Sequence, residues 1–353
     1  MLPDLLMLEN GQLLGDAHTW RRRRTELLDA ILQIEYGPLP PSMPGRGQGL
    51  HSHRMEGPAG ARHAVYRISI GESSEVQFAL DLLVPAGDEP FPVVLNGDAC
   101  WRSMTEDIAN EVLRRGNILA TFNRTEIAAD NGRIDTENGL SRLFPGWEFA
   151  ALSAWAWGYH RCVDFLTTLP FVDPDRIAIS GHSRGGKAAL LAGATDERIA
   201  LTNANASGCG GAGPYRVPSP KSETLADILR NFPYWFSPNL LAYVGQEDSL
   251  PFDQHALAAA VAPRALLFTE ARDDLWATPA GVQHTYDGAK PVFELLAAGS
   301  KIGIVLRDGS HAHNSEDWTA LLDFMDLQFW DNLLQEPGET AATALCEKSR
   351  RIT

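Results

Sequence analysis

The sequence is 353 residues long and carries a formal net charge of -15, and so acidic a surface repels the phosphates of nucleic acids. Hydrophobic residues make up 44% and charged residues 21%, the balance of an ordinary soluble globular chain. No apolar run reaches the roughly 18 residues that a membrane-spanning helix needs. The composition therefore predicts no nucleic-acid partner and no membrane partner, and it indicates no oligomeric state.

The first residues, MLPDLLMLENGQLL, lack the basic start and the uninterrupted apolar run of a signal peptide. The chain as given is expected to be cytoplasmic, or secreted or periplasmic if a leader has been removed. Its four cysteines show neither a metal pattern nor a C-x-x-C pair, and we expect free, mostly buried thiols. They are Cys100, Cys162, Cys209 and Cys346.

Hydrophobic periodicity predicts the elements in chain order. An apolar stripe through Trp20, Leu27 and Ile31 indicates a helix at residues 18–36, and a loop rich in Pro and Gly follows at residues 37–49. Strands are predicted at residues 64–70, 76–84, 91–95, 117–122, 176–180, 199–205, 264–268 and 302–306. Helices are predicted at residues 149–169, 187–193, 281–296 and 317–334.

Two long segments carry no strong periodicity. Residues 123–146 are polar and are expected to form a loop over the active face, and residues 207–250 are rich in Gly and Pro and are expected to be an insertion near the active site. No linker divides the chain. We therefore expect a single domain over residues 1–353, in which residues 1–60 supply an N-terminal helix and a wrapping segment.

The alternation of strands and helices predicts a three-layer α/β sandwich, with a mostly parallel central sheet covered by helices on both faces. Its sharpest motif is GHSRG at residues 181–185, which fits the G-x-S-x-G nucleophile elbow of α/β-hydrolases. The motif follows a predicted strand and opens a predicted helix, the context that it requires. Ser183 is therefore the predicted nucleophile, and a side chain at Gly181 or Gly185 would clash with the neighbouring chain.

A serine hydroxyl needs a base, which in this fold lies on the loop after the last strand. That loop offers His311 and His313. We favour His311, because a Gly-Ser pair places it in a tight turn, and keep His313 as the alternative. His255 and His284 are expected to be structural, since packed histidines with satisfied hydrogen bonds are the commoner case.

The acid that orients the base should follow the preceding strand, residues 264–268. Asp273 and Asp274 both lie there and both are candidates. The carboxylate that does not serve as the acid is expected to be solvated or paired with Arg272.

These segments resemble the glucuronoyl esterases, carbohydrate esterase family 15, in their bacterial branch. The resemblance covers nearly the whole chain, from the helix that begins at Trp20 to the closing helix. It is carried by WAWG at residues 155–158, GHSRGGKAAL at 181–190, SGCGGA at 207–212, LPFDQH at 250–255, APR at 262–264, DDLWA at 273–277 and the segment 311–318.

The resemblance implies roles for single residues. Ser183 would be the nucleophile, His311 the base and Asp274 the acid, and Arg184 would bind the oxyanion with its amide and its guanidinium. Donors of this kind stabilise negative charge where it develops.

The resemblance also implies a sugar site. Lys187 and Trp276 would contact the uronic acid ring, and Glu223 would accept hydrogen bonds from sugar hydroxyls. A tryptophan offers a flat surface for one face of a sugar.

The chain departs from the family pattern in places. Some members carry the acid in a stretch that aligns with residues 205–208, where this chain has Ala206. Fungal members flank the nucleophile and the base with cysteines that form a disulfide, and here those positions are His182 and Ala312. We therefore expect Asp274 to supply the acid and no such bridge to form.

The expected activity is hydrolysis of 4-O-methyl-glucuronate esters through an acyl-enzyme, on a small-molecule or polysaccharide ester of the glucuronoxylan type. An acetyl xylan esterase or another carboxylesterase is the alternative, because one fold hosts many substrates. A catalytically inactive carbohydrate-binding relative is the remote alternative. No cofactor is expected, and no metal site, since the His311-Ala312-His313 pair has no third ligand that the sequence can name.

Overall fold

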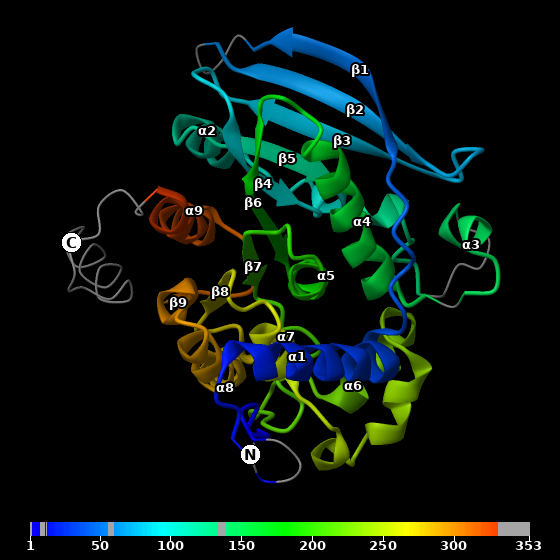
Figure 1. The fold of residues 1–353 in the computed structure, drawn as a ribbon, viewed down its shortest axis with the longest axis vertical. Coiled ribbons are helices and arrows are strands. Elements are labelled where there is room, and N and C mark those ends of the chain that lie inside the picture. Colours follow the sequence, from blue (N-terminus) through cyan, green and yellow to red (C-terminus); the bar gives the residue numbers. More distant parts are fainter. Residues whose placement is uncertain are drawn as a thin grey trace.

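The computed structural model describes residues 2–7, 11, 13–55, 60–132, 139–147 and 149–330. Its centre is a nine-stranded sheet in the order β1-β2-β3-β5-β4-β6-β7-β8-β9 (Figure 1). The first three strands and β5 pair antiparallel, and the six strands from β5 to β9 pair parallel. The strands are β1 Arg46–Arg54, β2 Arg62–Ile70, β3 Val76–Val84, β4 Phe91–Asn96, β5 Ile118–Phe122, β6 Val172–His182, β7 Leu201–Asn205, β8 Ala265–Ala271 and β9 Ile302–Arg307.

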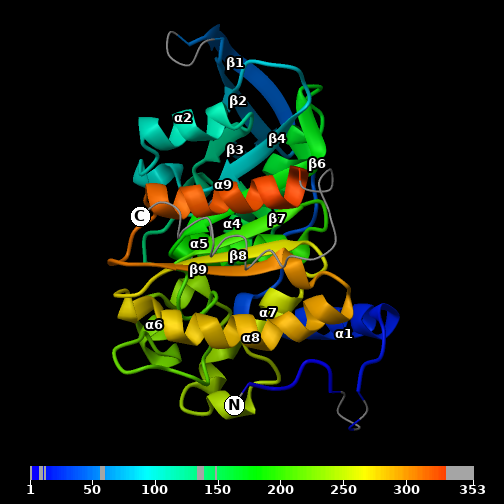
Figure 2. The ribbon, with the colours of Figure 1, turned by 90° about the vertical axis from the view of Figure 1, so that its left-hand side faces the viewer.

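Helices cover both faces of the sheet (Figure 2). One face is covered by α2 Glu106–Arg114 and α9 Ser315–Trp330. The other face is covered by α4 Ala151–Leu166, α5 Arg184–Thr195, α7 Gln254–Ala259 and α8 Pro279–Leu295, with α1 Ala17–Ile31 outside them. Two short helices, α3 Gly139–Leu143 and α6 Leu225–Asn231, lie in connecting segments. This is the α/β-hydrolase sandwich that the alternation of elements predicted.

Three strands of the sheet are buried along their whole length. β4, β7 and β8 expose no residue to solvent. Because both faces of these strands are buried, their sequences do not need to alternate between apolar and polar residues. By contrast β3 alternates buried and accessible residues, because helices cover its two faces unequally. The strands that the sequence predicts most clearly are therefore those on which both helical layers pack.

Several elements differ from the sequence prediction, which also lacks the short helices α3, α6 and α7. Part of the predicted loop at residues 37–49 belongs to β1, a strand whose nine residues are all exposed, so that its sequence carries no apolar pattern. Helix α2 was not predicted, although Thr105 caps its first turn and Ile108, Val112 and Leu113 face the core. The predicted closing helix is present as α9 up to Trp330, and residues 331–334 and Cys346 lie outside the described residues.

The segment between α1 and β1 runs along α4. The helix α1 continues as a wider π-helical turn over Leu32–Tyr36, and the chain then extends towards β1. Ser153 donates a hydrogen bond to the Tyr36 carbonyl (2.6 Å), and the Trp157 indole donates one to the Pro41 carbonyl (2.9 Å). Side chains of α4 thus hold the N-terminal segment against the sandwich.

Residues 207–250 consist mainly of short turns and the helix α6. They connect to the end of α1 through Tyr215, whose hydroxyl donates to the buried Glu35 carboxylate (2.6 Å). Within the described part of the chain, Cys100, Cys162 and Cys209 are free thiols, and no helix there is both long and apolar enough to cross a bilayer.

Candidate active site

The carboxyl ends of the parallel strands meet at one edge of the sheet, where open α/β sheets bind ligands. The elbow turn from β6 into α5 lies there, and Ser183 adopts φ 55° and ψ -122°, a region that side-chain-bearing residues rarely occupy. A Cβ on Gly181 would lie 2.2 Å from the Gly185 carbonyl oxygen, so the turn closes too tightly for a side chain. The predicted clash is therefore confirmed.

Below the elbow lies a buried ion pair that joins two further strand ends. Asp98 follows β4 and Arg124 follows β5, and both are almost inaccessible to solvent. One carboxylate oxygen of Asp98 binds Arg124, and the other accepts the backbone amide of His182 (2.7 Å). A Cβ on Gly185 would lie 2.0 Å from Asp98, so the second elbow glycine makes room for this carboxylate.

His311 and Asp274 lie together, with 2.5 Å between Nδ1 of the imidazole and Oδ2 of the carboxylate, and Asp274 is the one of the two candidate acids that the resemblance implies. Asp273 instead accepts a hydrogen bond from the backbone of Gly309 (3.2 Å) and holds the turn before His311. Within the described residues, no hydrogen bond joins the Ser183 hydroxyl to His311. Catalytic hydrogen bonds are often loose or unformed in unliganded sites.

His182 lies between the elbow and His311. Its ring centroid is 4.4 Å from that of His311, and its Nδ1 donates to the Asn205 side chain (2.5 Å). Burial, followed by the proximity of His311, lowers the pKa of His182 to about 4. This ring is therefore neutral at neutral pH, and it packs beside the imidazole of His311.

His313, the alternative base, is partly buried and stacks on Trp318 at 5.0 Å between ring centroids. Burial drives the pKa of His313 well below its usual value. No contact with Asp273 or Asp274 is formed by His313 among the described residues. The geometry thus favours His311 over His313.

Arg307, at the end of β9, shapes the loop that carries His311. Its guanidinium pairs with the buried Asp317 carboxylate of α9 (2.9 Å) and donates to the carbonyls of Ser310 (3.1 Å) and Ala312 (3.0 Å). The two carbonyls flank His311 in the chain. No local motif marks Arg307, and its role appears only when β9 and α9 are brought together.

Arg184 opens α5, where the first amides of a helix have no partner inside the helix. Its guanidinium forms an ion pair with Asp130 (2.8 Å) and lies over the Trp235 ring at 4.6 Å. Asp130 also accepts hydrogen bonds from Tyr234 (2.5 Å) and the Trp235 indole (3.1 Å). Burial raises the pKa of Asp130, but these hydrogen bonds outweigh burial and the pKa is lowered overall. Asp130, Tyr234 and Trp235 have no sequence signal of their own.

Lys187 lies one turn along α5 and is buried. Its Nζ donates to the carbonyls of Ser207 and Cys209, both at 2.5 Å, which leaves one of its three N–H groups. Burial lowers the pKa of Lys187 and raises that of Glu223, and each charge partly offsets the effect on the other. The amide of Glu223 donates to the Trp276 carbonyl (3.1 Å), and the Trp276 side chain is half exposed.

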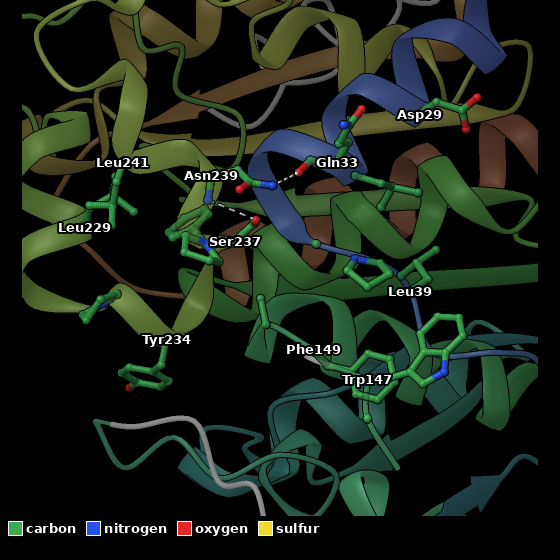
Figure 3. A pocket seen from close by; sticks show the side chains of 18 of the residues that line it. Asp29, Gln33, Leu39, Trp147, Phe149, Leu229, Tyr234, Ser237, Asn239 and Leu241 are labelled. Carbon is green, nitrogen blue, oxygen red and sulfur yellow. Dashed lines mark hydrogen bonds between the residues drawn. The ribbon is translucent and has the colours of Figure 1, made fainter. Parts of the chain in front are cut away.

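A cavity of 1230 Å³ adjoins this region (Figure 3). It lies between the end of α1 and the turns of the 229–241 segment, and Trp147, Phe149 and Tyr234 form part of its mostly apolar wall. The Tyr234 hydroxyl binds Asp130, the partner of Arg184, so one wall residue connects the cavity to the elbow. Ser183, Asp274 and His311 do not line it.

Comparison with known proteins points to one family. A family model described as "Glucuronyl esterase, fungi" matches residues 68–297. A carbohydrate esterase, MZ0003, from an unknown prokaryotic organism is 31% identical, over 92% of this chain and 89% of that protein. A 4-O-methyl-glucuronoyl methylesterase of Wolfiporia cocos is 29% identical, over 88% of this chain and 76% of that protein.

Solved structures agree in fold. A promiscuous CE15 esterase from a marine bacterial metagenome superposes with a TM-score of 0.83 at 28% identity, over 93% of this chain and 97% of that chain. A glucuronoyl esterase from Solibacter usitatus gives 0.86 at 27% identity, over 93% and 98% of the two chains. A mutant glucuronoyl esterase from Sporotrichum thermophile, in complex with methyl 4-O-methyl-β-D-glucopyranuronate, gives 0.75 at 26%, over 95% and 88%.

Proposed function

Since the chain belongs to the glucuronoyl esterase family, carbohydrate esterase family 15, and is a carboxylic ester hydrolase, we propose that it cleaves esters of 4-O-methyl-glucuronic acid through an acyl-enzyme on Ser183. The observation that carries this proposal is the 2.5 Å contact between His311 and Asp274 beside the elbow serine. Ser183, Asp274 and His311 follow β6, β8 and β9, whose carboxyl ends lie at one edge of the sheet, and this supports a nucleophile, an acid and a base acting together.

The proposed reaction has two halves. Ser183 attacks the C6 carbonyl of the uronate while His311 takes the hydroxyl proton at Nε2, and His311 then returns that proton to the departing alcohol. Water attacks the acyl-enzyme in the same way and releases the uronic acid. Asp274 keeps Nδ1 of His311 protonated and stabilises the imidazolium that forms twice in each cycle.

Arg184 supplies the oxyanion site in this proposal. Its backbone amide at the start of α5 and its guanidinium are the donors, and Asp130 with the Trp235 ring hold the guanidinium in place. A positive group that is already oriented costs no reorganisation when negative charge develops on the carbonyl oxygen.

Lys187, Glu223 and Trp276 form the proposed sugar site. The free N–H of Lys187 is a donor to a ring hydroxyl, Glu223 is an acceptor, and the half-exposed Trp276 ring is a platform for the pyranose face. Lys187 is held by two carbonyls, so its remaining donor points in a fixed direction.

The test compares kcat/KM for benzyl glucuronate and for p-nitrophenyl acetate. The glucuronate ester is expected to be hydrolysed at least as well as the acetate, and Ser183→Ala is expected to lose at least about 10⁴-fold on both. Fast acetate turnover without glucuronate turnover would refute the proposed substrate, while activity that survives in Ser183→Ala would refute the proposed nucleophile.

Trp276→Ala separates sugar binding from chemistry. We expect KM for the glucuronate to rise about tenfold while acetate kinetics stay the same, because the lost stacking surface serves only the sugar. Trp330→Ala, which removes another exposed tryptophan, from α9, is the matched control. Unchanged glucuronate kinetics in Trp276→Ala would exclude the sugar site.

A further inference from the structure

Three histidines gather on the antiparallel strands at the end of the sheet farthest from β9 (Figure 1). His51 and His53 are two residues apart on β1 and therefore point to the same face, and His63 lies directly opposite His53 on β2. Their candidate ligand atoms all lie within 4.8 Å of one another. The ring centroids form a triangle with sides of 5.6, 5.0 and 5.2 Å.

An acidic side chain completes the group. Both carboxylate oxygens of Asp81, on β3, lie 2.9 Å from Nε2 of His63. A carboxylate on the ring nitrogen that does not bind metal is the usual partner that orients a metal-binding histidine and raises its basicity. Arg54 and Arg62 adjoin His53 and His63 in the chain and by strand alternation point to the opposite face, and Arg62 lies over the Phe171 ring at 4.5 Å.

We propose that His51, His53 and His63 bind one Zn²⁺ ion on the exposed face of the β1–β2 pair, with Asp81 orienting His63. Neutral imidazole is a preferred ligand of Zn²⁺, and three protein ligands with an open fourth position for water form a common site. Two histidines on one ion lie about 3.4 Å apart for Zn–N bonds of about 2.1 Å. Side-chain rotation closes the remaining gap, and rotation is easy because His51 and His53 are exposed.

The ion would fasten the edge of the sheet. Every residue of β1 is exposed, and among the described strands it pairs only with β2, so packing adds little to its stability. A bridge from His51 and His53 to His63 joins the two strands through side chains as well as through backbone hydrogen bonds. The site is five strands away from the elbow, about 20–25 Å, and it therefore does not act in the esterase reaction.

Equilibrium dialysis of the full chain against ZnCl₂ tests the proposal. The wild type is expected to bind one Zn²⁺ per chain tightly, and His53→Ala and His63→Ala are each expected to weaken that binding by at least about 100-fold. Asp81→Asn is expected to weaken it about 10- to 100-fold, as the loss of a second-layer carboxylate does. His284→Ala, an exposed histidine on α8, is the matched control and is expected to bind Zn²⁺ as the wild type does.

A thermal measurement accompanies the dialysis. Zn²⁺ in excess is expected to raise the Tm of the wild type by at least about 3 °C and to leave that of His53→Ala unchanged, because only the native site binds. Equal binding by wild type and His53→Ala would overturn the proposal. So would zinc binding that His311→Ala abolishes and His53→Ala preserves, because the ion would then be bound at the catalytic histidine.

Discussion

Asp274 and Asp273 are adjacent in the chain, yet their carboxylates face different groups. Asp274 also accepts from the backbone of Ala277 (3.4 Å), and it is nearly buried. Among the described residues, Asp273 exchanges hydrogen bonds with the backbone of Gly309, in the turn that leads to His311. The short 3₁₀ turn after Asp274 thus directs one of two chemically identical side chains towards the imidazole.

Asp274→Asn is expected to lower kcat on a glucuronate ester by about 10³–10⁴-fold, because an amide can hold the imidazole in the wrong tautomer and cannot stabilise its charged form. Asp273→Asn is the matched control, and its kcat should stay within about threefold of the wild type. A similar loss in both variants would mean that the turn as a whole, rather than the Asp274 carboxylate, supports the base.

Sequence reasoning located Ser183 and His311 because each follows a predicted strand in a fold whose active residues occupy strand ends. It left Asp273 and Asp274 open, because spacing alone does not give the direction of a side chain. It missed Asp98, Arg124 and Asp130 altogether. Asp98 follows β4, whereas Arg124 and Asp130 follow β5, all in segments without motifs, and only the assembly of the sheet brings these strand ends to the elbow.

At the scale of elements, one arginine holds the loop that connects β9 to α9. Replacing Arg307 by Met removes the donors to the carbonyls on both sides of His311 and leaves the Asp317 carboxylate buried without its partner. An unpaired buried charge costs about 3–5 kcal/mol of folding stability. Arg307 is therefore a positioning residue rather than a group that touches substrate.

Arg307→Met is expected to reduce kcat about 10- to 100-fold at a temperature where the variant is folded, since small displacements of a catalytic group are costly. KM should change little, because no sugar contact is lost. Arg272→Met, which removes an exposed ion pair with Asp308, is the control and should behave as the wild type. If both variants keep full kcat, the loop positions His311 without Arg307.

Most of the long elements with a clear apolar pattern were predictable from the sequence, although α2 was missed. The central strands and α4, α5 and α8 carry apolar patterns that the helical layers and the sheet impose on them. The strand β1 carries no such pattern, because its sequence RGQGLHSHR faces solvent, and only pairing with β2 makes it a strand. The register of β1 against β2 also brings His63 beside His51 and His53, and no local sequence pattern predicts that contact.

Across the whole molecule, Glu35 lies where three distant parts of the chain meet. It ends the α1 region, accepts from Tyr215 in the 207–250 segment (2.6 Å), and accepts from Gln254 at the start of α7 (2.7 Å). Burial raises the pKa of Glu35 to about 7, although the hydrogen bonds from Tyr215 and Gln254 oppose the shift. The folded chain therefore holds this proton over a pH range in which the unfolded chain has released it.

A raised carboxyl pKa makes the folded state lose stability as pH rises. The contribution of Glu35 to the free energy of unfolding is fully present below about pH 4.5. It declines by about 1.4 kcal/mol per pH unit up to about pH 7 and stays constant above that, after a total loss of about 3 kcal/mol. Urea unfolding of Glu35→Gln between pH 5 and pH 8 should show a stability that falls less steeply than that of the wild type. Glu26→Gln, on the exposed side of α1, is the control, and parallel curves for wild type and Glu35→Gln would contradict the assignment.

The fold of the whole molecule was predictable because a parallel sheet between two helical layers follows from the order of the elements alone. How the N-terminal helix and residues 207–250 join the sandwich was not. That junction depends on buried polar contacts such as those of Glu35. In the sequence, a carboxyl in an amphipathic helix looks like a solvated residue, because its hydrogen-bond partners lie elsewhere in the chain.

Because β1 is an edge strand of the sheet, it affects how the protein behaves at high concentration. A strand with unpaired backbone groups along one side can recruit the same strand of another molecule. Here Arg46 and Arg54 stand at its two ends, and an irregularity between Gly49 and His51 bends its course. Variants that replace these polar and irregular positions with β-branched residues should precipitate sooner than the parent, even though they touch neither the catalytic groups nor the core.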